Sequence, residues 1–242
     1  MTVSPHPFRL ILFDVDGTLI DCGGQPKPLF AEALVEVFGT AGDIARYRFT
    51  GRTDPRIVFD LMTGAGVAPE RVLEELPRLR DAYLDRLAAR LDPGRIRVLP
   101  AVEERLAALA QRADLTVGLL TGNWERGARI KLGRVGLDRF FAFGAFGDDQ
   151  IDRRDLPPVA LLRAGERAGR SFLPEETLIV GDSPLDVECA RAHHIPCWAV
   201  ATGWTSAEDL VRAGADRVLA DLLEWDEGRD PAAAEEIALR NR

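Results

Sequence analysis

The chain has 242 residues, 46% of them hydrophobic, and a formal net charge of −8. That length suits one large domain or a core with an inserted subdomain, and the apolar content argues against a disordered chain. The acidic balance argues against binding to nucleic acid, whose phosphates require clustered Lys and Arg. No apolar run approaches the roughly 20 residues that span a bilayer, and the start of the chain lacks the layout of a secretory signal, so we expect a cytoplasmic protein with no membrane partner.

Short apolar runs alternate with helical patterns, which is typical of a parallel sheet wrapped by helices. The first run, residues 9–13 (RLILF), is almost wholly apolar, which predicts a strand buried on both faces. Further strands are predicted at residues 115–120, 140–143, 177–180, 197–200 and 217–219. Helices are predicted at residues 101–112, 125–133, 156–168 and 185–192. Right-handed crossovers place such helices on both faces, so the predicted fold class is a Rossmann-like, doubly wound α/β core.

Residues 23–93 interrupt this alternation. They contain no convincing strand but three helical patterns, at residues 28–38, 54–63 and 69–91, separated by glycines. We therefore predict an inserted α-helical cap over residues 23–93, with the core formed by residues 1–22 and 94–242. The charged, alanine-rich tail at residues 224–242 is expected to form a terminal helix or to fray.

The three cysteines, Cys22, Cys189 and Cys197, form no CxxC pair. Such a sparse, odd set describes neither a disulfide scaffold nor a zinc site. We expect all three to be reduced and structural.

The clearest chemical signal is Asp14-Val15-Asp16-Gly17-Thr18-Leu19, directly after the first predicted strand. Residues two apart on an extended chain point the same way, roughly 7 Å apart. Two carboxylates at the end of a buried strand are costly unless a cation or a reaction requires them. Since ligands bind at the carboxyl ends of strands in open α/β sheets, this motif indicates a site rather than an ordinary turn.

A second acidic motif, Gly181-Asp182-Ser183-Pro184-Leu185-Asp186, follows the run TLIV. A helix beginning after Ser183 would place Pro184 at its first position and Asp186 in its first turn. Asp186 would then support the helix cap, while Asp182 lies at a strand end as a candidate metal ligand. The two interpretations are compatible, because a capped helix holds Asp182 in place.

Groups that bind phosphate are the third signal. Thr121-Gly122-Asn123 follows the run LTVGLL and offers side-chain and backbone donors at a strand-to-helix junction. A fixed cation is also needed, but only two lysines occur, Lys27 and Lys131, and Lys131 lies in a pattern that indicates an exposed helix face. Arg153 and Arg154 precede a predicted helix, and either arginine can hold a phosphate.

Together these motifs resemble the haloacid dehalogenase superfamily, in its phosphoglycolate phosphatase-like branch with a helical cap. The resemblance spans residues 14–186. It implies that Asp14 is the nucleophile, forming an aspartyl phosphate, and that Asp16 is the general acid and base. It implies that Thr121 binds the phosphoryl group, with Gly122 and Asn123 beside it. Arg153 would replace the usual lysine, which is the main departure and leaves Arg154 as the alternative.

The resemblance also implies a cofactor and a substrate class. Mg²⁺ would be bound by Asp14, the backbone carbonyl of Asp16 and Asp182, with Asp186 in support. The substrate would be a small phosphorylated metabolite, which the cap selects. Within the cap, residues 49–54 are the segment expected to face the site, with Arg52 available for an anionic substrate. The oligomeric state expected is a monomer or a homodimer.

Single residues argue against some of the competing functions. Asp16 argues against carbon–halogen cleavage, because dehalogenases lack this second aspartate, and phosphonate hydrolysis needs a cap lysine where only Lys27 is available. A sugar phosphomutase shares every core residue named and stays open. An inactive phosphate- or metal-binding regulatory module would be expected to have lost the nucleophile or the acid, and both are present.

Overall fold

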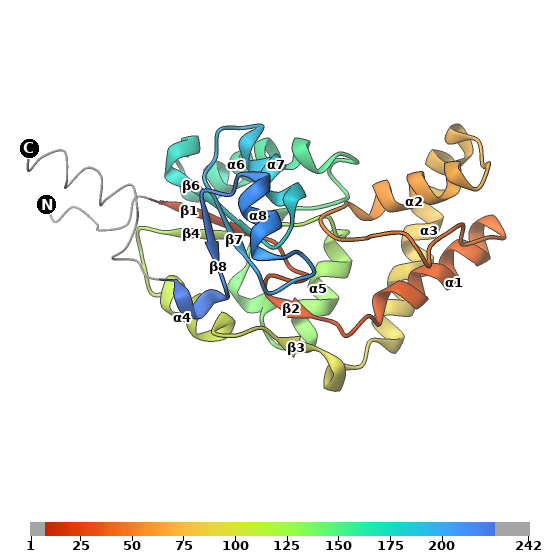
Figure 1. Ribbon diagram of the computed structural model, residues 1–242, viewed down its shortest axis with the longest axis horizontal. Helices are drawn as coiled ribbons and strands as arrows, with labels where there is room; N and C mark the ends of the chain where they lie inside the picture. Colours follow the sequence, from red (N-terminus) through yellow and green to blue (C-terminus); the bar gives the residue numbers. More distant parts are fainter. Residues whose placement is uncertain (1–7, 226–242) are drawn as a thin grey trace, which may run out of the picture.

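A six-stranded parallel sheet forms the centre of the computed structural model, which describes residues 8–225 (Figure 1). Its strands are β1 (Leu10–Phe13), β4 (Thr116–Leu120), β5 (Gly144–Ala145), β6 (Thr177–Gly181), β7 (Cys197–Val200) and β8 (Arg217–Leu219). They lie in the order β5-β4-β1-β6-β7-β8, so β1 is paired with β4 on one side and β6 on the other. The predicted Rossmann-like α/β core is confirmed.

One predicted strand was wrong. Residues 140–143 do not form a strand; Asp138–Phe140 is a short 3₁₀ helix, and β5 follows at Gly144–Ala145. Phe141 and Phe143 are buried by side-chain packing instead, and a Cβ on Gly118 of β4 would overlap the ring of Phe143. The apolar run therefore reflects a turn packed into the core, a signal that periodicity does not separate from a buried strand.

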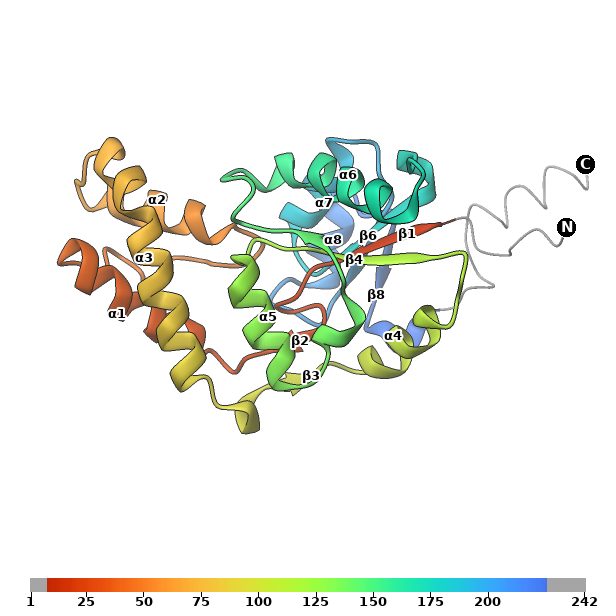
Figure 2. The ribbon, with the colours of Figure 1, turned by 180° about the vertical axis from the view of Figure 1, so that it is seen from behind.

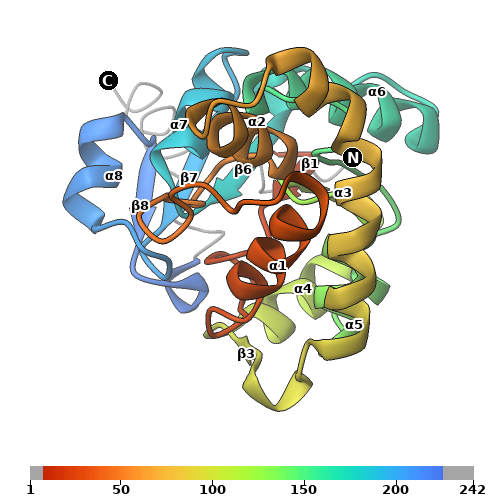
Figure 3. The ribbon, with the colours of Figure 1, turned by 90° about the vertical axis from the view of Figure 1, so that its right-hand side faces the viewer.

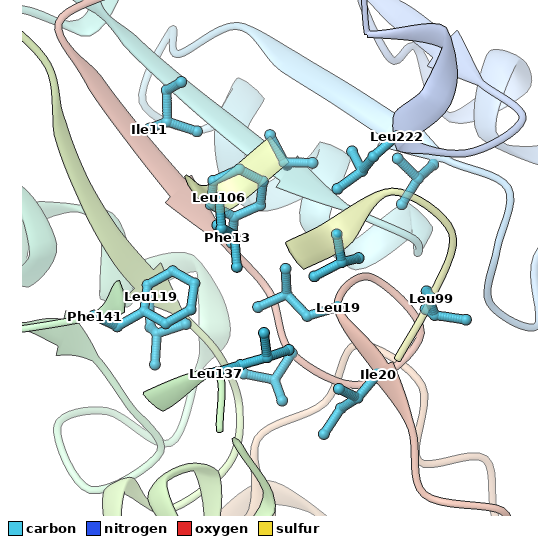
Figure 4. Packing of buried hydrophobic residues seen from close by; sticks show 14 of the residues in the cluster. Ile11, Phe13, Leu19, Ile20, Leu99, Leu106, Leu119, Leu137, Phe141 and Leu222 are labelled. Carbon is cyan, nitrogen blue, oxygen red and sulfur yellow. The ribbon is translucent and has the colours of Figure 1, made fainter. Parts of the chain in front are cut away.

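Helices cover both faces of the sheet. Helices α4 (Val102–Ala110) and α5 (Glu125–Arg134) lie on one face, and α6 (Leu156–Ala168), α7 (Pro184–Arg191) and α8 (Ala207–Ala213) on the other (Figure 2). Strand β1 serves both layers, because successive side chains alternate between faces. Ile11 and Phe13 join the cluster with Leu106 and Leu119, visible in Figure 4, whereas Leu10 and Leu12 join the cluster with α6 and α7.

Three helices form a separate group beyond the carboxyl ends of the strands. They are α1 (Pro26–Phe38), α2 (Asp54–Gly64) and α3 (Pro69–Arg90), which lie together in Figures 1 and 3. They bury their own apolar cluster, in which Phe30 lies against Tyr83 with ring centroids 4.8 Å apart. Trp124, which follows β4, stacks on Phe30 at 6.0 Å and so joins this helical group to the core.

A small antiparallel pair marks where the chain leaves and re-enters the core. Strand β2 (Ile20–Asp21) pairs with β3 (Arg97–Val98), and neither strand was predicted, because two residues are too short to show a period. The helix α8 was also missed. The remaining short elements are 3₁₀ helices at Pro93–Arg95, Arg153–Asp155, Pro174–Glu176 and Leu222–Glu224.

Two further expectations can be compared with the described part of the chain. Cys22, Cys189 and Cys197 are free and buried, as predicted. Across residues 8–225, no helix is both long and apolar enough to cross a membrane. Most of the tail at residues 224–242 lies outside the described residues.

Candidate active site

The predicted site residues follow three neighbouring strands. Asp14 comes directly after β1, Thr121 after β4 and Asp182 after β6, and these strands are adjacent in the sheet. Parallel strands end at one edge, so the three side chains lie at the same edge, beneath the helical group. All three are buried, with exposed fractions of 5%, 0% and 1%.

Three carboxylates form a compact cluster at this edge. Oxygen atoms of Asp14, Asp182 and Asp186 all lie within 4.8 Å of one another. Thr18 Oγ1 donates to Asp182 Oδ1 at 3.4 Å, but Asp182 Oδ2 is buried and has no hydrogen-bond partner. A buried carboxylate oxygen without a donor is costly. The oxygen-only donor set and this orphaned atom fit a hard divalent cation such as Mg²⁺.

Backbone glycines make room for the cluster. Gly17 has a positive φ of +87°, which favours glycine, and a Cβ there would overlap the Asp182 carboxylate. A Cβ on Gly203 would overlap the same carboxylate from the loop after β7. Asp182 is therefore enclosed by backbone on two sides, which fixes the position of its oxygens.

The charges at this site are strongly perturbed. Burial raises the pKa of Asp14 to about 6, against the lowering effect of Arg153. Burial, together with the charges of Asp186 and Asp14, raises the pKa of Asp182 well above its usual range. Positive charge placed among these carboxylates would lower both pKa values.

The structure separates the two candidate arginines. Arg153 is 6% exposed, and its Nη2 lies 3.2 Å from Asp14 Oδ1 and 2.5 Å from Asp186 Oδ1. Arg154 points away: its side chain is 62% exposed and pairs with Asp152 at 2.6 Å. Only Arg153 of the two therefore lies beside the acidic cluster.

Asp186 has both of its oxygens engaged by protein groups. Ser183 caps α7, and Asp186 Oδ2 accepts from the Ser183 backbone N–H at 3.0 Å and from Oγ at 2.6 Å. Its other oxygen pairs with Arg153. The predicted helix start, with Pro184 in its first position, is confirmed. Asp186 thus orients Arg153 and the loop that carries Asp182.

The loop after β4 connects the phosphate-binding candidates to Asp16. The Asn123 side-chain amide Nδ2 donates to Thr121 Oγ1 at 2.8 Å and to Asp16 Oδ2 at 2.8 Å. Lys131 Nζ donates to the same Asp16 oxygen at 2.6 Å and to Asn123 Oδ1 at 2.6 Å. Asp16 and Asn123 are therefore members of one hydrogen-bonded network.

The segment at residues 49–54 lies against the core loops that carry these groups. A Cβ on Gly122 would overlap the backbone of Arg52, and a Cβ on Gly51 would overlap Ser183. Thr53 Oγ1 donates to the Ile151 carbonyl at 2.5 Å. The Arg52 guanidinium itself lies 3.6 Å from Asp60 and 5.5 Å from the ring centre of Tyr47, both within the helical group.

The family of the chain follows from its likeness to known proteins. A family model described as haloacid dehalogenase-like hydrolase matches residues 11–191. The chain belongs to this family. A phosphoglycolate phosphatase of Mesorhizobium japonicum is 32% identical over 199 residues, which cover 81% of this chain and 84% of that protein. Phosphoglycolate phosphatase 1 of Pseudomonas aeruginosa is 28% identical over 232 residues, covering 93% and 81%.

Solved structures share the fold of this chain. The crystal structure of a hydrolase from Pseudomonas syringae superposes with a TM-score of 0.62 at 27% identity, covering 89% of this chain and 96% of that one. A haloacid dehalogenase-like hydrolase from Bacteroides fragilis, at 23% identity and a TM-score of 0.67, shares the fold. The prediction of a phosphatase of this family is confirmed.

The expectation that Lys131 of this haloacid dehalogenase-like hydrolase lies on an exposed helix face was wrong. Lys131 is only 4% exposed. The buried face of α5 consists of Gly127, Ala128, Lys131 and Leu132. Their helical spacing was the signal that sequence reasoning missed. Burial alone would lower the pKa of Lys131, but nearby acidic groups, Asp16 foremost, raise it overall, so the side chain stays charged.

Asp54 was also missed. It is 7% exposed at the start of α2, where its Oδ2 accepts from the Trp124 backbone N–H at 2.9 Å. Its own N–H donates to the Gly122 carbonyl at 2.7 Å. Burial raises the pKa of Asp54 to about 7, although Lys131 opposes the change. The Thr53-Asp54 pair resembles an ordinary helix start in sequence, which concealed this contact between the helical group and the core.

Proposed function

We propose that this chain is a Mg²⁺-dependent phosphomonoester hydrolase that acts on a small phosphorylated metabolite through an aspartyl phosphate on Asp14. The observation that carries the proposal is the buried cluster of Asp14, Asp182 and Asp186, in which one Asp182 oxygen has no hydrogen-bond partner and Arg153 lies beside Asp14. Such a cluster would hold a divalent cation, and the cation and Arg153 together would attract the phosphate to the nucleophile.

The reaction has two steps on the protein's own groups. An Asp14 oxygen attacks phosphorus, forming a new O–P bond while the bond to the ester oxygen breaks, and Asp16 gives its proton to the leaving oxygen. Water then attacks the phosphorus of the aspartyl phosphate, and Asp16 takes the proton of that water. Inorganic phosphate leaves and the Asp14 carboxylate is restored.

The transferred group needs donors for its oxygens. Arg153 is buried and carries a fixed positive charge beside Asp14, and the Thr121 hydroxyl lies at the end of the adjacent strand. In a buried site, these donors stabilise the charge that accumulates on the three equatorial oxygens in the transition state. Gly122 and Asn123 would complete this side of the site.

Asp14, Asp182 and the backbone carbonyl of Asp16 would hold the Mg²⁺ ion, with Asp186 orienting the set. When bound, the ion reduces the repulsion between the anionic nucleophile and the anionic phosphate. Burial raises the pKa of both Asp14 and Asp182, and a cation bound between them would oppose that shift.

The relatives named above suggest the substrate. They are phosphoglycolate phosphatases, so we propose 2-phosphoglycolate as the first compound to examine. Residues 23–93 would act as the cap that selects it, because their segment around Arg52 and Thr53 contacts the loops of the site. Arg52 is the cap group that we propose for the carboxylate of such a substrate, and its guanidinium would have to turn from Asp60 and Tyr47 to reach it.

The test compares the wild type with Asp14→Asn on p-nitrophenyl phosphate, 2-phosphoglycolate and a panel of sugar phosphates, with Mg²⁺ and with EDTA. We expect phosphate release that requires Mg²⁺ and is lost in Asp14→Asn. Asp85→Asn, whose side chain is 70% exposed on α3, is the matched control and should retain activity. Full activity in Asp14→Asn would refute the nucleophile, and turnover only after priming with a sugar bisphosphate would indicate a mutase.

A further inference from the structure

Lys131 has no role in the chemistry proposed above, although it is one of only two lysines in the sequence. It lies on α5 with 4% exposure, and its ammonium nitrogen is 2.6 Å from Asp16 Oδ2. The Asp16 side chain is 41% exposed. A buried ammonium group is therefore paired with a carboxylate that is partly open to solvent. This asymmetry requires an explanation.

Lys131, Asn123 and Asp16 are joined in a closed triangle of hydrogen bonds. Lys131 Nζ and Asn123 Nδ2 both donate to Asp16 Oδ2, at 2.6 and 2.8 Å, and Lys131 also donates to Asn123 Oδ1 at 2.6 Å. Two donors on a single oxygen fix both the position and the rotation of the carboxylate. Asn123 is held in turn through Thr121, so the triangle is anchored to the end of β4.

Stability alone does not account for this arrangement. Burying an ammonium costs several kcal/mol, and an apolar side chain of similar size usually serves a fold as well or better. The neighbours of Lys131 on α5 are Gly127, Ala128 and Leu132, so an apolar residue would suit the same face. The charge is therefore best explained by the group that it binds.

We infer that Lys131 is a positioning residue for Asp16: with Asn123 it holds the carboxyl group where it meets the leaving oxygen and then the attacking water. The inference rests on the proposed function, in which Asp16 transfers those protons. Lys131 keeps its own protons throughout, and no bond to it forms or breaks. A misplacement of about 1 Å in such a group is enough to slow a reaction about 10²-fold.

The experiment measures the two steps separately with p-nitrophenyl phosphate in rapid mixing. The p-nitrophenolate group leaves without a proton, so the first step depends little on Asp16, whereas the attack of water depends on it fully. In Lys131→Met we expect a burst whose rate is within about threefold of the wild type, followed by steady turnover slowed about 10²-fold. With an alkyl ester such as 2-phosphoglycolate, both steps should be slower in Lys131→Met, because its leaving oxygen needs the proton of Asp16.

Two variants control the result. Lys27→Met removes the other lysine, which donates to the carbonyls of Ala45 and Tyr47, and should change neither phase more than about twofold. Lys131→Arg keeps the charge with a different reach. It should fold as the wild type does and should slow the second step by an intermediate factor, so it serves if Lys131→Met does not fold.

A double variant distinguishes this inference from the function on which it rests. If Lys131 acts through Asp16, then Asp16→Asn with Lys131→Met should be no slower than Asp16→Asn alone. Multiplicative losses, or equal losses in the burst and in steady turnover, would overturn the positioning role. Full activity in Asp16→Asn would instead overturn the proposed acid and base, and with it the inference.

Discussion

Asp182 and Asp54 are both carboxylates removed from solvent, but they differ in the protein groups that surround them. Asp182 and Asp54 are 1% and 7% exposed, and burial raises the pKa of each. Asp54 accepts from the Trp124 backbone N–H, with the charge of Lys131 acting on it, whereas Asp182 Oδ2 has no protein partner. The hydrogen bond of Asp54 joins the helical group to the core. The Asp182 oxygen without a hydrogen-bond partner is instead suited to bind a ligand.

The variant Asp182→Asn tests most directly whether Asp182 is a ligand-binding carboxylate. In the presence of Mg²⁺ we expect activity to fall about 10³-fold or more, because the cluster loses a charged ligand. In EDTA the same variant should be more stable than the wild type by about 1–3 kcal/mol, since a repelled, unpaired charge is removed. Phosphate release in Mg²⁺ measures the loss of activity, and urea unfolding in EDTA measures the gain in stability. A variant that is less stable in EDTA would contradict the ligand interpretation.

Arg153 and Arg154 provide a matched pair at the same cluster. Arg153→Met should lower turnover about 10²-fold, because it removes the only one of the two guanidinium groups that lies beside Asp14. Arg154→Met should change turnover less than about twofold, since the Arg154 side chain is 62% exposed and bound to Asp152. Steady-state kinetics on one phosphomonoester measures both, and equal losses would mean that the assignment to Arg153 is wrong.

The sequence predicted the part of the site that stands at strand ends. Asp14, Thr121 and Asp182 each follow an apolar run, and parallel topology brings such ends together. Lys131 and Asp54 could not be found in this way. Each belongs to a helix whose partner is far along the chain, and its burial depends on how the helical group packs on the core. The strand at residues 140–143 was wrong for the same reason, since packing rather than pairing buries Phe143.

The variant Asp54→Asn tests how the second carboxylate, Asp54, makes the free energy of unfolding depend on pH. The folded pKa of Asp54 is about 7 against an ordinary 3.8, so the folded state binds more protons between those values. The favourable contribution of protonated Asp54 is complete below about pH 4 and is lost as the pH rises to about 7. Asn cannot ionise but still accepts from Trp124. The stability of Asp54→Asn relative to the wild type should therefore rise by roughly 2–4 kcal/mol across that window and level off above it.

Urea unfolding at several pH values between 4.5 and 8 measures this difference. Asp85→Asn, an exposed aspartate on α3, serves as the control and should follow the wild type at every pH. The comparison between the two buried carboxylates would fail if the difference were constant across the window, because Asp54 would then titrate as an ordinary surface group.

The smallest expected effect concerns Thr53, which joins the helical group to the core without any charge. Its hydroxyl caps α2 by accepting from the Arg56 N–H at 3.2 Å and donates to the Ile151 carbonyl at 2.5 Å. Thr53→Val keeps the shape and removes both bonds, so we expect a loss of about 1–2 kcal/mol in unfolding free energy. Thr53→Ser keeps the hydroxyl and should lose less than half of that. If the bond to Ile151 holds the helical group over the site, Thr53→Val should also raise KM severalfold with little change in kcat, whereas a capping role alone would leave KM unchanged.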